Sequence, residues 1–144
     1  MIREAKPEEA FTVAKFMCKF EKATAFVRVD PVHAGKKYAE FIRNGTGKMF
    51  ILENMNKKMI GGLGCVIGED LHFPRTLAIE TYWFVQEEFR GRGIALLNYF
   101  ESWAESKGYI PAMIHLADSY PESLKRLYLK RGYKLVETHY IKEI

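Results

Sequence analysis

Two arginines alternate with two glycines near the middle of the chain, and such a segment can bind an anion. The residues are Arg90, Gly91, Arg92 and Gly93, followed by Ile94 and Ala95. A glycine-rich turn that opens a helix directs several backbone N–H groups, and the positive end of the helix dipole, at one point. Glycine lets the main chain approach an anion closely, and arginine adds fixed positive charge. This spacing therefore favours a pyrophosphate site.

Two other phosphate-binding patterns fit the segment poorly. A Walker loop needs a Lys-Ser or Lys-Thr pair after its second glycine, and no such pair follows Gly93. The dinucleotide fingerprint G-x-G-x-x-G needs a third glycine where this chain has Leu96. An ordinary turn, whose glycines serve only the backbone geometry, therefore stays open as an alternative.

The flanking patterns show which elements must position these residues. Residues 80–85 are rich in β-branched and aromatic side chains, which is typical of a strand. After the glycines, apolar residues recur at helical spacing as far as Lys107. They are Leu96, Leu97, Phe100, Trp103 and Ala104. The predicted order is a strand, the glycine-rich turn and an amphipathic helix.

This order resembles the signature of the GNAT superfamily of N-acetyltransferases, Arg90-x-x-Gly93-x-Ala95 after a strand that ends in Trp-Phe-Val. A second stretch, Leu124 to Tyr133, is similar to the later motif of that family, a helix with a tyrosine followed by glycine and an aromatic residue. The resemblance implies an α/β fold of GNAT type, with a central mixed β-sheet flanked by helices on both faces. Its expected order is β-α-α-β-β-β-α-β-α-β, in a single domain over residues 1–144.

The resemblance also implies a reaction, the direct transfer of an acetyl group from acetyl-coenzyme A to a primary amine in a ternary complex. Such a transfer needs a pyrophosphate site, a hold on the thioester carbonyl, a base for the ammonium proton and an acid for the thiolate. We therefore expect an acyltransferase with acetyl-coenzyme A as cosubstrate and without a metal. The histidines, at positions 33, 72, 115 and 139, lack the spacing of a metal site.

By the same resemblance, the strand before the glycine-rich turn holds the cofactor. The main chain of residues 90–95 would bind the pyrophosphate, and the pantetheine would pair with the strand edge at Trp83, Phe84 and Val85. A backbone N–H of Phe84 or Val85 would polarise the thioester carbonyl. Glu80, on the same strand, matches a glutamate that serves as base in some members. The alternative for Glu80 is a rim carboxylate paired with a lysine.

Tyr128 matches the family tyrosine that protonates the departing thiolate. Its alternative is a core tyrosine, because neighbouring leucines share its helical face. Members often have a cofactor-binding asparagine one turn before this helix, and here Pro121 stands in that register. Ser119 or Ser123 would have to replace that contact.

The acceptor stays open among a small amine, a polyamine, an aminoglycoside, a protein lysine or N-terminus, and a charged tRNA. The sequence has too few clustered acidic residues to predict an acidic groove of the kind that a polycation would need. Two other functions are weighed against the enzyme. One is a module that binds acyl-coenzyme A or a partner protein without catalysis. The other is a nucleic-acid-binding protein that uses the basic residues of the last helix, Lys125, Arg126, Lys130 and Arg131. A homodimer is also considered.

The composition limits these functions further. The chain has 144 residues, 48% of them hydrophobic and 28% charged, as expected for a globular protein. A formal charge of +4 suits an anionic cofactor but is too small for a nucleic-acid footprint. Cys18 and Cys65 are far apart and are expected to be reduced core residues. No apolar run is long enough to span a bilayer and none resembles a signal peptide, so we expect a cytoplasmic protein.

The remaining elements follow from turn and capping signals. Strands are expected at residues 2–5, 48–53, 59–67, 76–85 and 111–117, with an extended segment at 133–141. Helices are expected from Pro7 and from Asp30-Pro31, the latter ending at Asn44-Gly45. A last helix, from Tyr120 to Arg131, would carry a capping box of Ser119 and Glu122, with Pro121 in its first turn. Glycines at 61, 62 and 64 predict bulges or close backbone approach.

Overall fold

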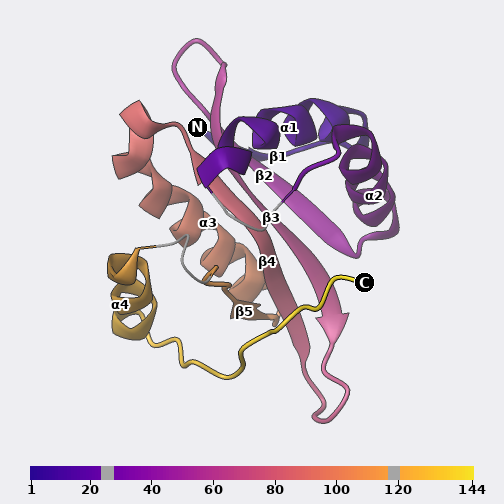
Figure 1. Ribbon diagram of the computed structural model, residues 1–144, viewed down its shortest axis with the longest axis vertical. Coiled ribbons are helices and arrows are strands. Elements are labelled where there is room, and N and C mark those ends of the chain that lie inside the picture. Colours follow the sequence, from indigo (N-terminus) through magenta and orange to yellow (C-terminus); the bar gives the residue numbers. More distant parts are fainter. Residues whose placement is uncertain (24–27, 117–120) are drawn as a thin grey trace.

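The computed structural model describes residues 1–23, 28–116 and 121–144 (Figure 1). The strands are β1 (Ile2–Glu4), β2 (Gly47–Glu53), β3 (Met59–Glu69), β4 (Thr76–Val85) and β5 (Ile110–Ala112). The α-helices are α1 (Ala10–Met17), α2 (Pro31–Asn44), α3 (Gly93–Ser106) and α4 (Glu122–Lys130). Three 3-10 helices complete the set, η1 (Pro7–Glu9), η2 (Cys18–Ala23) and η3 (Glu87–Arg92).

The strands form one mixed sheet in the order β1-β2-β3-β4-β5. The first four are antiparallel neighbours, whereas β5 runs parallel to β4. A parallel pair needs a crossover, and α3 provides it between β4 and β5. The expected mixed sheet and the order of elements as far as the last helix are thus confirmed.

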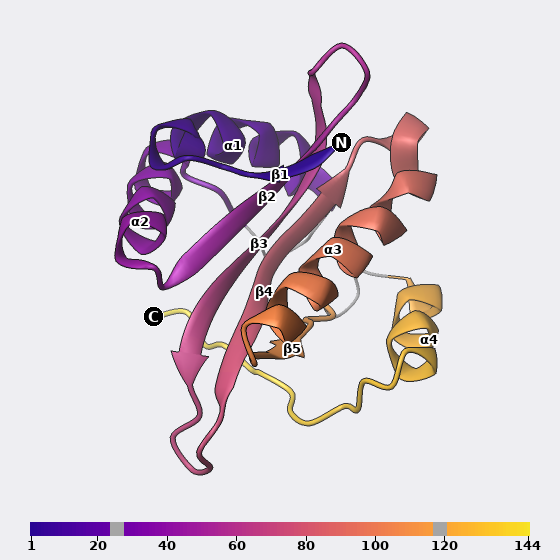
Figure 2. The ribbon, with the colours of Figure 1, turned by 180° about the vertical axis from the view of Figure 1, so that it is seen from behind.

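Helices cover both faces of the sheet (Figures 1 and 2). On one face, α1 and α2 bury apolar residues that include Ala10, Val13 and Met17 against Met49, Ile51 and Tyr82. On the other face, α3 packs Leu96, Leu97, Phe100 and Ala104 on Phe50, Leu63, Cys65 and Ala78. The short helix α4 lies beside α3 on that second side (Figure 2). The free thiol of Cys65 is buried, as expected, and the free thiol of Cys18 is half-buried.

The predicted ends of α2 are confirmed. The Asp30 carboxylate accepts hydrogen bonds from the N–H groups of Val32 and His33, each at 3.0 Å. Pro31 occupies the first helical position, where its missing N–H costs nothing. Gly45 ends the helix with φ of 72°, a left-handed conformation that glycine adopts without strain.

The structure corrects three expectations for the last third of the chain. Within the strand expected at residues 111–117, of which residue 117 lies outside the described residues, only the short strand β5 forms, because the main chain leaves β4 after Ala112. The last helix begins at Glu122, with Pro121 in an extended conformation at the N-cap rather than in the first turn. Ser119, and with it the predicted capping box, lies outside the described residues.

The third correction concerns the extended segment expected at residues 133–141. Among residues 121–144, which are all described, none after α4 joins a strand ladder. Leu135, Val136 and Tyr140 lie exposed, Tyr140 with 94% of its surface accessible. An apolar strand pattern is not enough to form a strand where the main chain meets no sheet edge to pair with. The last predicted strand is therefore wrong.

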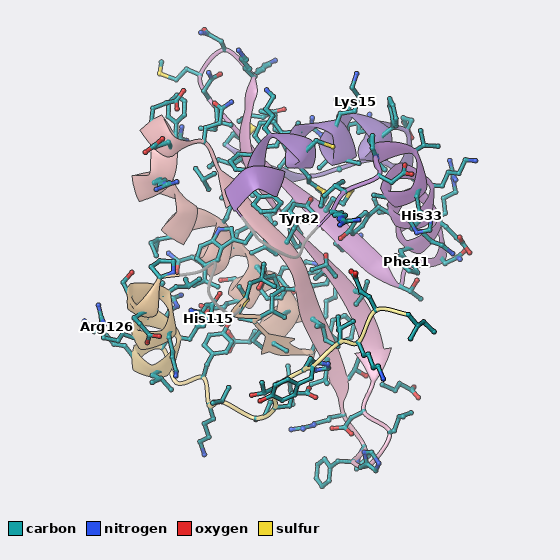
Figure 3. The ribbon with its side chains drawn as sticks, viewed as in Figure 1. Lys15, His33, Phe41, Tyr82, His115 and Arg126 are labelled. Carbon is teal, nitrogen blue, oxygen red and sulfur yellow. The ribbon has the colours of Figure 1, made fainter. Side chains whose placement is uncertain are left out.

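The glycines of β3 accommodate one aromatic ring. Tyr82 on β4 pairs with Gly64 and lays its ring over β3 on the α1–α2 side (Figure 3). A Cβ atom at Gly64 would lie 2.1 Å from Cε1 of Tyr82, whereas one at Gly68 would meet nothing within 4 Å. The predicted close backbone approach is found at Gly61, where a Cβ atom would lie 2.7 Å from the Phe84 carbonyl oxygen, whereas the close neighbour of Gly64 is a side chain.

This geometry makes Gly64→Ala destabilising. We expect the free energy of unfolding to fall by about 1–3 kcal/mol, the usual cost of overpacking a core. Gly68→Ala in the same strand is the matched control, and we expect it to change stability by no more than about 0.5 kcal/mol. Urea unfolding of the two variants measures both. Equal stability of the variants would contradict the tight packing of Tyr82 on Gly64.

Candidate active site

A bulge in β4 separates Glu80 from the end of the strand that precedes the glycine-rich segment. Gly64 pairs with Tyr82 and Cys65 pairs with Glu80, so Thr81 has no partner across the β3–β4 ladder. The Tyr38 hydroxyl, from α2, donates a hydrogen bond to Thr81 Oγ1 at 2.5 Å. A bulge re-aims the side chains that follow it. Glu80, before the bulge, shares the α3 side of the sheet with Ala78, while Tyr82, after the bulge, faces α1 and α2.

Glu80 occupies the point where β4 and β5 separate. The last ladder pair between these strands is Ile79 with Ala112. Two residues beyond Ala112, the Ile114 N–H donates to Glu80 Oε2 at 2.9 Å. The carboxyl group therefore accepts the hydrogen bond of a backbone N–H that a carbonyl group of a neighbouring strand would otherwise accept. The alternative of a rim carboxylate paired with a lysine is wrong, because Glu80 is only 1% exposed.

The environment of Glu80 favours its neutral form. Burial raises the pKa of Glu80 to about 8, against the smaller opposing effect of the Ile114 N–H. No basic side chain is among the causes of the shift. The second oxygen, Oε1, is buried without a hydrogen-bond partner among the described residues. A carboxyl group with such a pKa and an open acceptor atom can exchange a proton near neutral pH.

Tyr128 meets the same main-chain segment from α4. Its hydroxyl donates to the carbonyl oxygen of Ile114 at 3.2 Å, and its side chain is buried. The peptide groups on either side of one residue thus hold both candidate side chains, with Ile114 N–H on Glu80 and Ile114 C=O on Tyr128. No sequence pattern predicts this link, because the main chain of any residue type could make it.

The glycine-rich segment differs in form from the expected open turn. Residues 87–92 form η3, which continues without a break into α3, and the Gly93 N–H donates to the Arg90 carbonyl. Such 3-10 turns are common at helix N-termini. Arg90, Gly91 and Arg92 are exposed, and a Cβ atom at Gly91 would meet nothing within 4 Å. The main chain is thus accessible at Gly91, while Glu87 and Glu88 add acidic groups to the first turn of η3.

The end of β4 lies directly beside this segment. Val85 and Trp83 pack against the α3 side of the sheet, and a Cβ atom at the buried Gly93 would lie 3.4 Å from Val85 Cγ2. Phe84 faces the other side and stacks on Phe20, with ring centroids 4.8 Å apart. The structure thus brings the predicted strand edge next to Gly93. Binding of a cofactor there stays a prediction.

The remaining predicted positions are more scattered. Ile94 and Ala95 are exposed in the first turn of α3, and Ser123 is exposed in the first turn of α4. His115 lies between α4 and the sheet, with Nε2 at 3.3 Å from the Pro121 carbonyl oxygen (Figure 3). Among the described residues, no group of three or more His, Cys, Asp or Glu could hold a metal ion.

The basic residues of the last helix do not act as one group. Lys125, Arg126 and Lys130 are exposed, and Arg126 lies on the outer side of α4 (Figure 3). Arg131 instead forms an ion pair with Glu101 on α3. The charge pattern alone predicted a solvated face, and it could not separate Arg131 from its neighbours. Over the described part of the chain, no helix is both long and apolar enough to cross a membrane.

Comparison with known proteins agrees with this fold. Residues 14–133 match the model of the acetyltransferase (GNAT) family. No curated protein matches the chain. Three solved structures illustrate the likeness of fold. A ribosomal-protein-alanine N-acetyltransferase from Brucella melitensis has 14% identity and a TM-score of 0.73, over 100% of this chain and 99% of that one.

The second is an aminoglycoside 6'-N-acetyltransferase from Acinetobacter baumannii, with 17% identity and a TM-score of 0.72, over 100% of this chain and 98% of that one. The third is an acetyltransferase from Trypanosoma brucei, with 18% identity and a TM-score of 0.70, over 100% of this chain and 99% of that one. At these identities the likeness shows a shared fold and carries no information on the acceptor.

The burial of Glu80 makes stability depend on pH. The unfolded chain loses this proton near the ordinary value of 4.5, whereas the folded protein keeps it until about pH 8. Between these values the folded state binds more protons, so the favourable contribution of Glu80 is complete below pH 4.5 and is lost as the pH rises towards 8. Glu80→Gln removes this loss. We expect the stability of the variant, relative to the parent, to rise with pH by on the order of a few kcal/mol.

Urea unfolding at several pH values across this window measures the effect. Glu105→Gln, on the exposed side of α3, is the control and should keep the pH dependence of the parent. Parallel curves for the parent and Glu80→Gln would show that the carboxyl group is ionised in the folded protein throughout the window.

Proposed function

We propose that this chain, which belongs to the acetyltransferase (GNAT) family, moves an acetyl group from acetyl-coenzyme A to a primary amine by direct transfer in a ternary complex. The observation that carries the proposal is the link through Ile114. It places a buried carboxyl group and a buried hydroxyl group on the two sides of one short main-chain segment. A transfer of this kind needs such a pair, one group to take a proton and one to give a proton.

The residues at the start of α3 suit the cosubstrate. Arg90 and Arg92 place two positive charges on the last turn of η3, and Gly91 leaves its main chain open to a phosphate oxygen. The dipole of the fourteen-residue helix α3, which η3 extends, adds partial positive charge at this end. Trp83, Phe84 and Val85 lead from this point towards Glu80 along one strand. We assign the pyrophosphate to residues 90–95 and the pantetheine to residues 83–85.

Glu80 is assigned as the base. Its ionised form accepts a proton from the ammonium group of the acceptor at Oε1, the oxygen that Ile114 leaves unbound. The elevated pKa makes the carboxylate a stronger base than an exposed glutamate, but only a fraction is ionised at neutral pH. Activity should therefore rise with pH up to about 8. Because Glu80 is 1% exposed, the proton reaches it from within the site rather than from bulk solvent.

Tyr128 is assigned as the acid. When bound, acetyl-coenzyme A supplies the acetyl group as a thioester. The Tyr128 hydroxyl gives its proton to the sulfur when the acetyl group has left, and the resulting phenolate is reprotonated afterwards. The hydroxyl now donates to the Ile114 carbonyl at 3.2 Å, a long hydrogen bond that costs little to exchange. We assign Ser123 and Ser119 as further cofactor contacts, the latter from sequence alone.

The experiment that tests the proposal is the melting temperature with and without acetyl-coenzyme A. A ligand at about a hundred times its dissociation constant stabilises a protein by about 2.7 kcal/mol, which is several degrees for a domain of this size. In Gly93→Ala the added methyl group would lie 3.4 Å from Val85 Cγ2, an ordinary contact that the fold tolerates, and it adds bulk beside Val85 and Trp83, which are assigned to the cofactor. We expect this variant to lose most of the shift.

Gly68→Ala, remote from the site, is the control and should keep the full shift. No shift in the parent protein at millimolar cofactor would contradict the proposal. An unchanged shift in Gly93→Ala would place the cofactor elsewhere.

Tyr128→Phe tests the acid. We expect the turnover number to fall by about 10²-fold or more, the usual contribution of a general acid. The Michaelis constant for acetyl-coenzyme A should stay within about threefold, because the hydroxyl acts on the sulfur only during transfer. Tyr140→Phe, on an exposed tyrosine, is the control. Steady-state release of free thiol, measured with an amine panel, gives both constants. An unchanged turnover number would remove Tyr128 from the mechanism.

Two alternatives give different results in these assays. A module that binds acyl-coenzyme A without catalysis would show the melting shift but no turnover with any amine. A nucleic-acid-binding protein that uses Lys125, Arg126 and Lys130 would show affinity for tRNA or DNA that falls steeply with salt.

A further inference from the structure

Helix α4 carries Tyr128, and among the residues of this helix only Tyr128 is buried. It has nine residues, and an isolated helix of that length is not stable in water. Tyr128 is its one buried residue, and Leu127 packs partly against the core of the α3 side. The position of the Tyr128 hydroxyl therefore depends on whatever fixes the ends of α4.

The C-terminal end of α4 is fixed by one carboxylate on α3. Glu101 accepts a hydrogen bond from Arg131 Nε at 3.1 Å and a second from the same guanidinium through its other oxygen. The Tyr133 hydroxyl donates to Glu101 Oε1 at 2.9 Å. Arg131 also donates to Asn98 Oδ1 at 2.6 Å. A two-point arginine–carboxylate pair fixes orientation as well as distance.

Electrostatics agree with this arrangement. Burial alone would raise the pKa of Glu101, but the hydrogen bonds from Arg131 and Tyr133 outweigh it and hold the pKa below its ordinary value. The pKa of Tyr133 is raised by burial and by its hydrogen bond to Glu101, so the tyrosine keeps the proton that it donates. Both partners of the ion pair are one quarter exposed, so the pair itself adds little to global stability. Its effect is on geometry.

The turn after α4 connects this cluster to Tyr128. Gly132 has φ of 93°, a left-handed conformation that turns the chain back on the helix. The Tyr133 N–H donates to the Tyr128 carbonyl at 3.0 Å, and the two rings pack with centroids 5.6 Å apart. Tyr133 thus contacts Tyr128 with its ring and Glu101 with its hydroxyl. The Tyr128 hydroxyl, on the other side, reaches Ile114.

We propose that Glu101 is a positioning residue for transfer, because it holds Arg131 and Tyr133 and through them sets the place of the Tyr128 hydroxyl. Glu101 itself touches neither cosubstrate nor acceptor in this assignment. The inference rests on the proposed role of Tyr128 as acid. A displacement of about 1 Å in a reacting group can cost about 10²-fold in rate, so a loosened α4 should slow the chemical step.

Glu101→Gln tests the proposal, since it keeps the size of the side chain but removes the charge that Arg131 binds. We expect the turnover number to fall by about tenfold, with the Michaelis constant for acetyl-coenzyme A within about threefold. Glu105→Gln, one helical turn further along α3 and exposed, is the matched control and should match the parent. The double variant Glu101→Arg with Arg131→Glu reverses the pair and should recover part of the lost turnover.

A second background separates positioning from other effects. In Tyr128→Phe there is no hydroxyl left to position, so Glu101→Gln should cause no further loss of turnover. An equal loss in both backgrounds would overturn the proposal, because Glu101 would then act independently of Tyr128. An unchanged turnover number for Glu101→Gln in the parent background would overturn it as well.

Amide hydrogen exchange tests the contact without any assay of activity. Exchange of the α4 amides should speed up by about tenfold in Glu101→Gln and stay unchanged in Glu105→Gln. If Tyr128→Phe alone leaves turnover intact, the assigned acid fails, and the exchange result still decides whether Glu101 holds α4. Unchanged exchange in Glu101→Gln would show that the cluster does not hold the helix.

Discussion

The structure depends on one hydrogen bond in which a side chain takes the place of a neighbouring strand as acceptor. Where β5 leaves β4, the Ile114 N–H loses its partner in the ladder, and the Glu80 carboxyl group accepts its hydrogen bond instead. Buried backbone donors must be satisfied, and a strand can leave a sheet only if something else accepts its hydrogen bonds. A carboxyl group in this place is costly, because burial favours its neutral form. The same burial gives Glu80 a pKa of about 8, close to the pH at which the base of the proposed reaction would work, so in that proposal one residue serves both the fold and the chemistry.

Directly after Glu80, a bulge turns β4 so that the next residues contact the opposite side of the sheet. Thr81 is the extra residue of the bulge, and the Tyr38 hydroxyl from α2 binds it. Beyond the bulge, Tyr82 turns towards α1 and α2 and occupies the space over Gly64. Gly64 of β3 thus accommodates the turn of β4 that follows Glu80, although it lies on another strand. A larger residue at Gly64 would leave no room for the Tyr82 ring.

The sequence predicted most of this fold and only part of this site. Periodicity, the Asp30-Pro31 cap and Gly45 were enough to place α2, and the aromatic run from Glu80 placed β4, because these signals are local. Residues 133–141 have a strand pattern but no partner, and pairing is a property of the whole fold that a local pattern does not contain. The link through Ile114 could not be predicted, since Ile114 contributes only its main-chain N–H and carbonyl groups, which any residue type carries. Arg131 appeared as one more charge on a basic helix, and only the position of α3 sets it apart.

Around Tyr128, apolar burial stabilises the fold, whereas polar contacts fix the position of α4. The core of the α3 side supplies the energy that keeps α3 on the sheet, and it is dominated by side chains such as Leu96, Leu97 and Phe100. Helix α4 adds little to that core, so burial alone would leave its position poorly determined. Directional contacts fix what burial does not, since Glu101 binds two side chains that follow α4 and Ile114 binds the Tyr128 hydroxyl. A helix that is held at a few polar points can be adjusted by single substitutions without loss of the fold. That property suits the proposed role of α4, in which its position would govern a proton transfer rather than the stability of the protein.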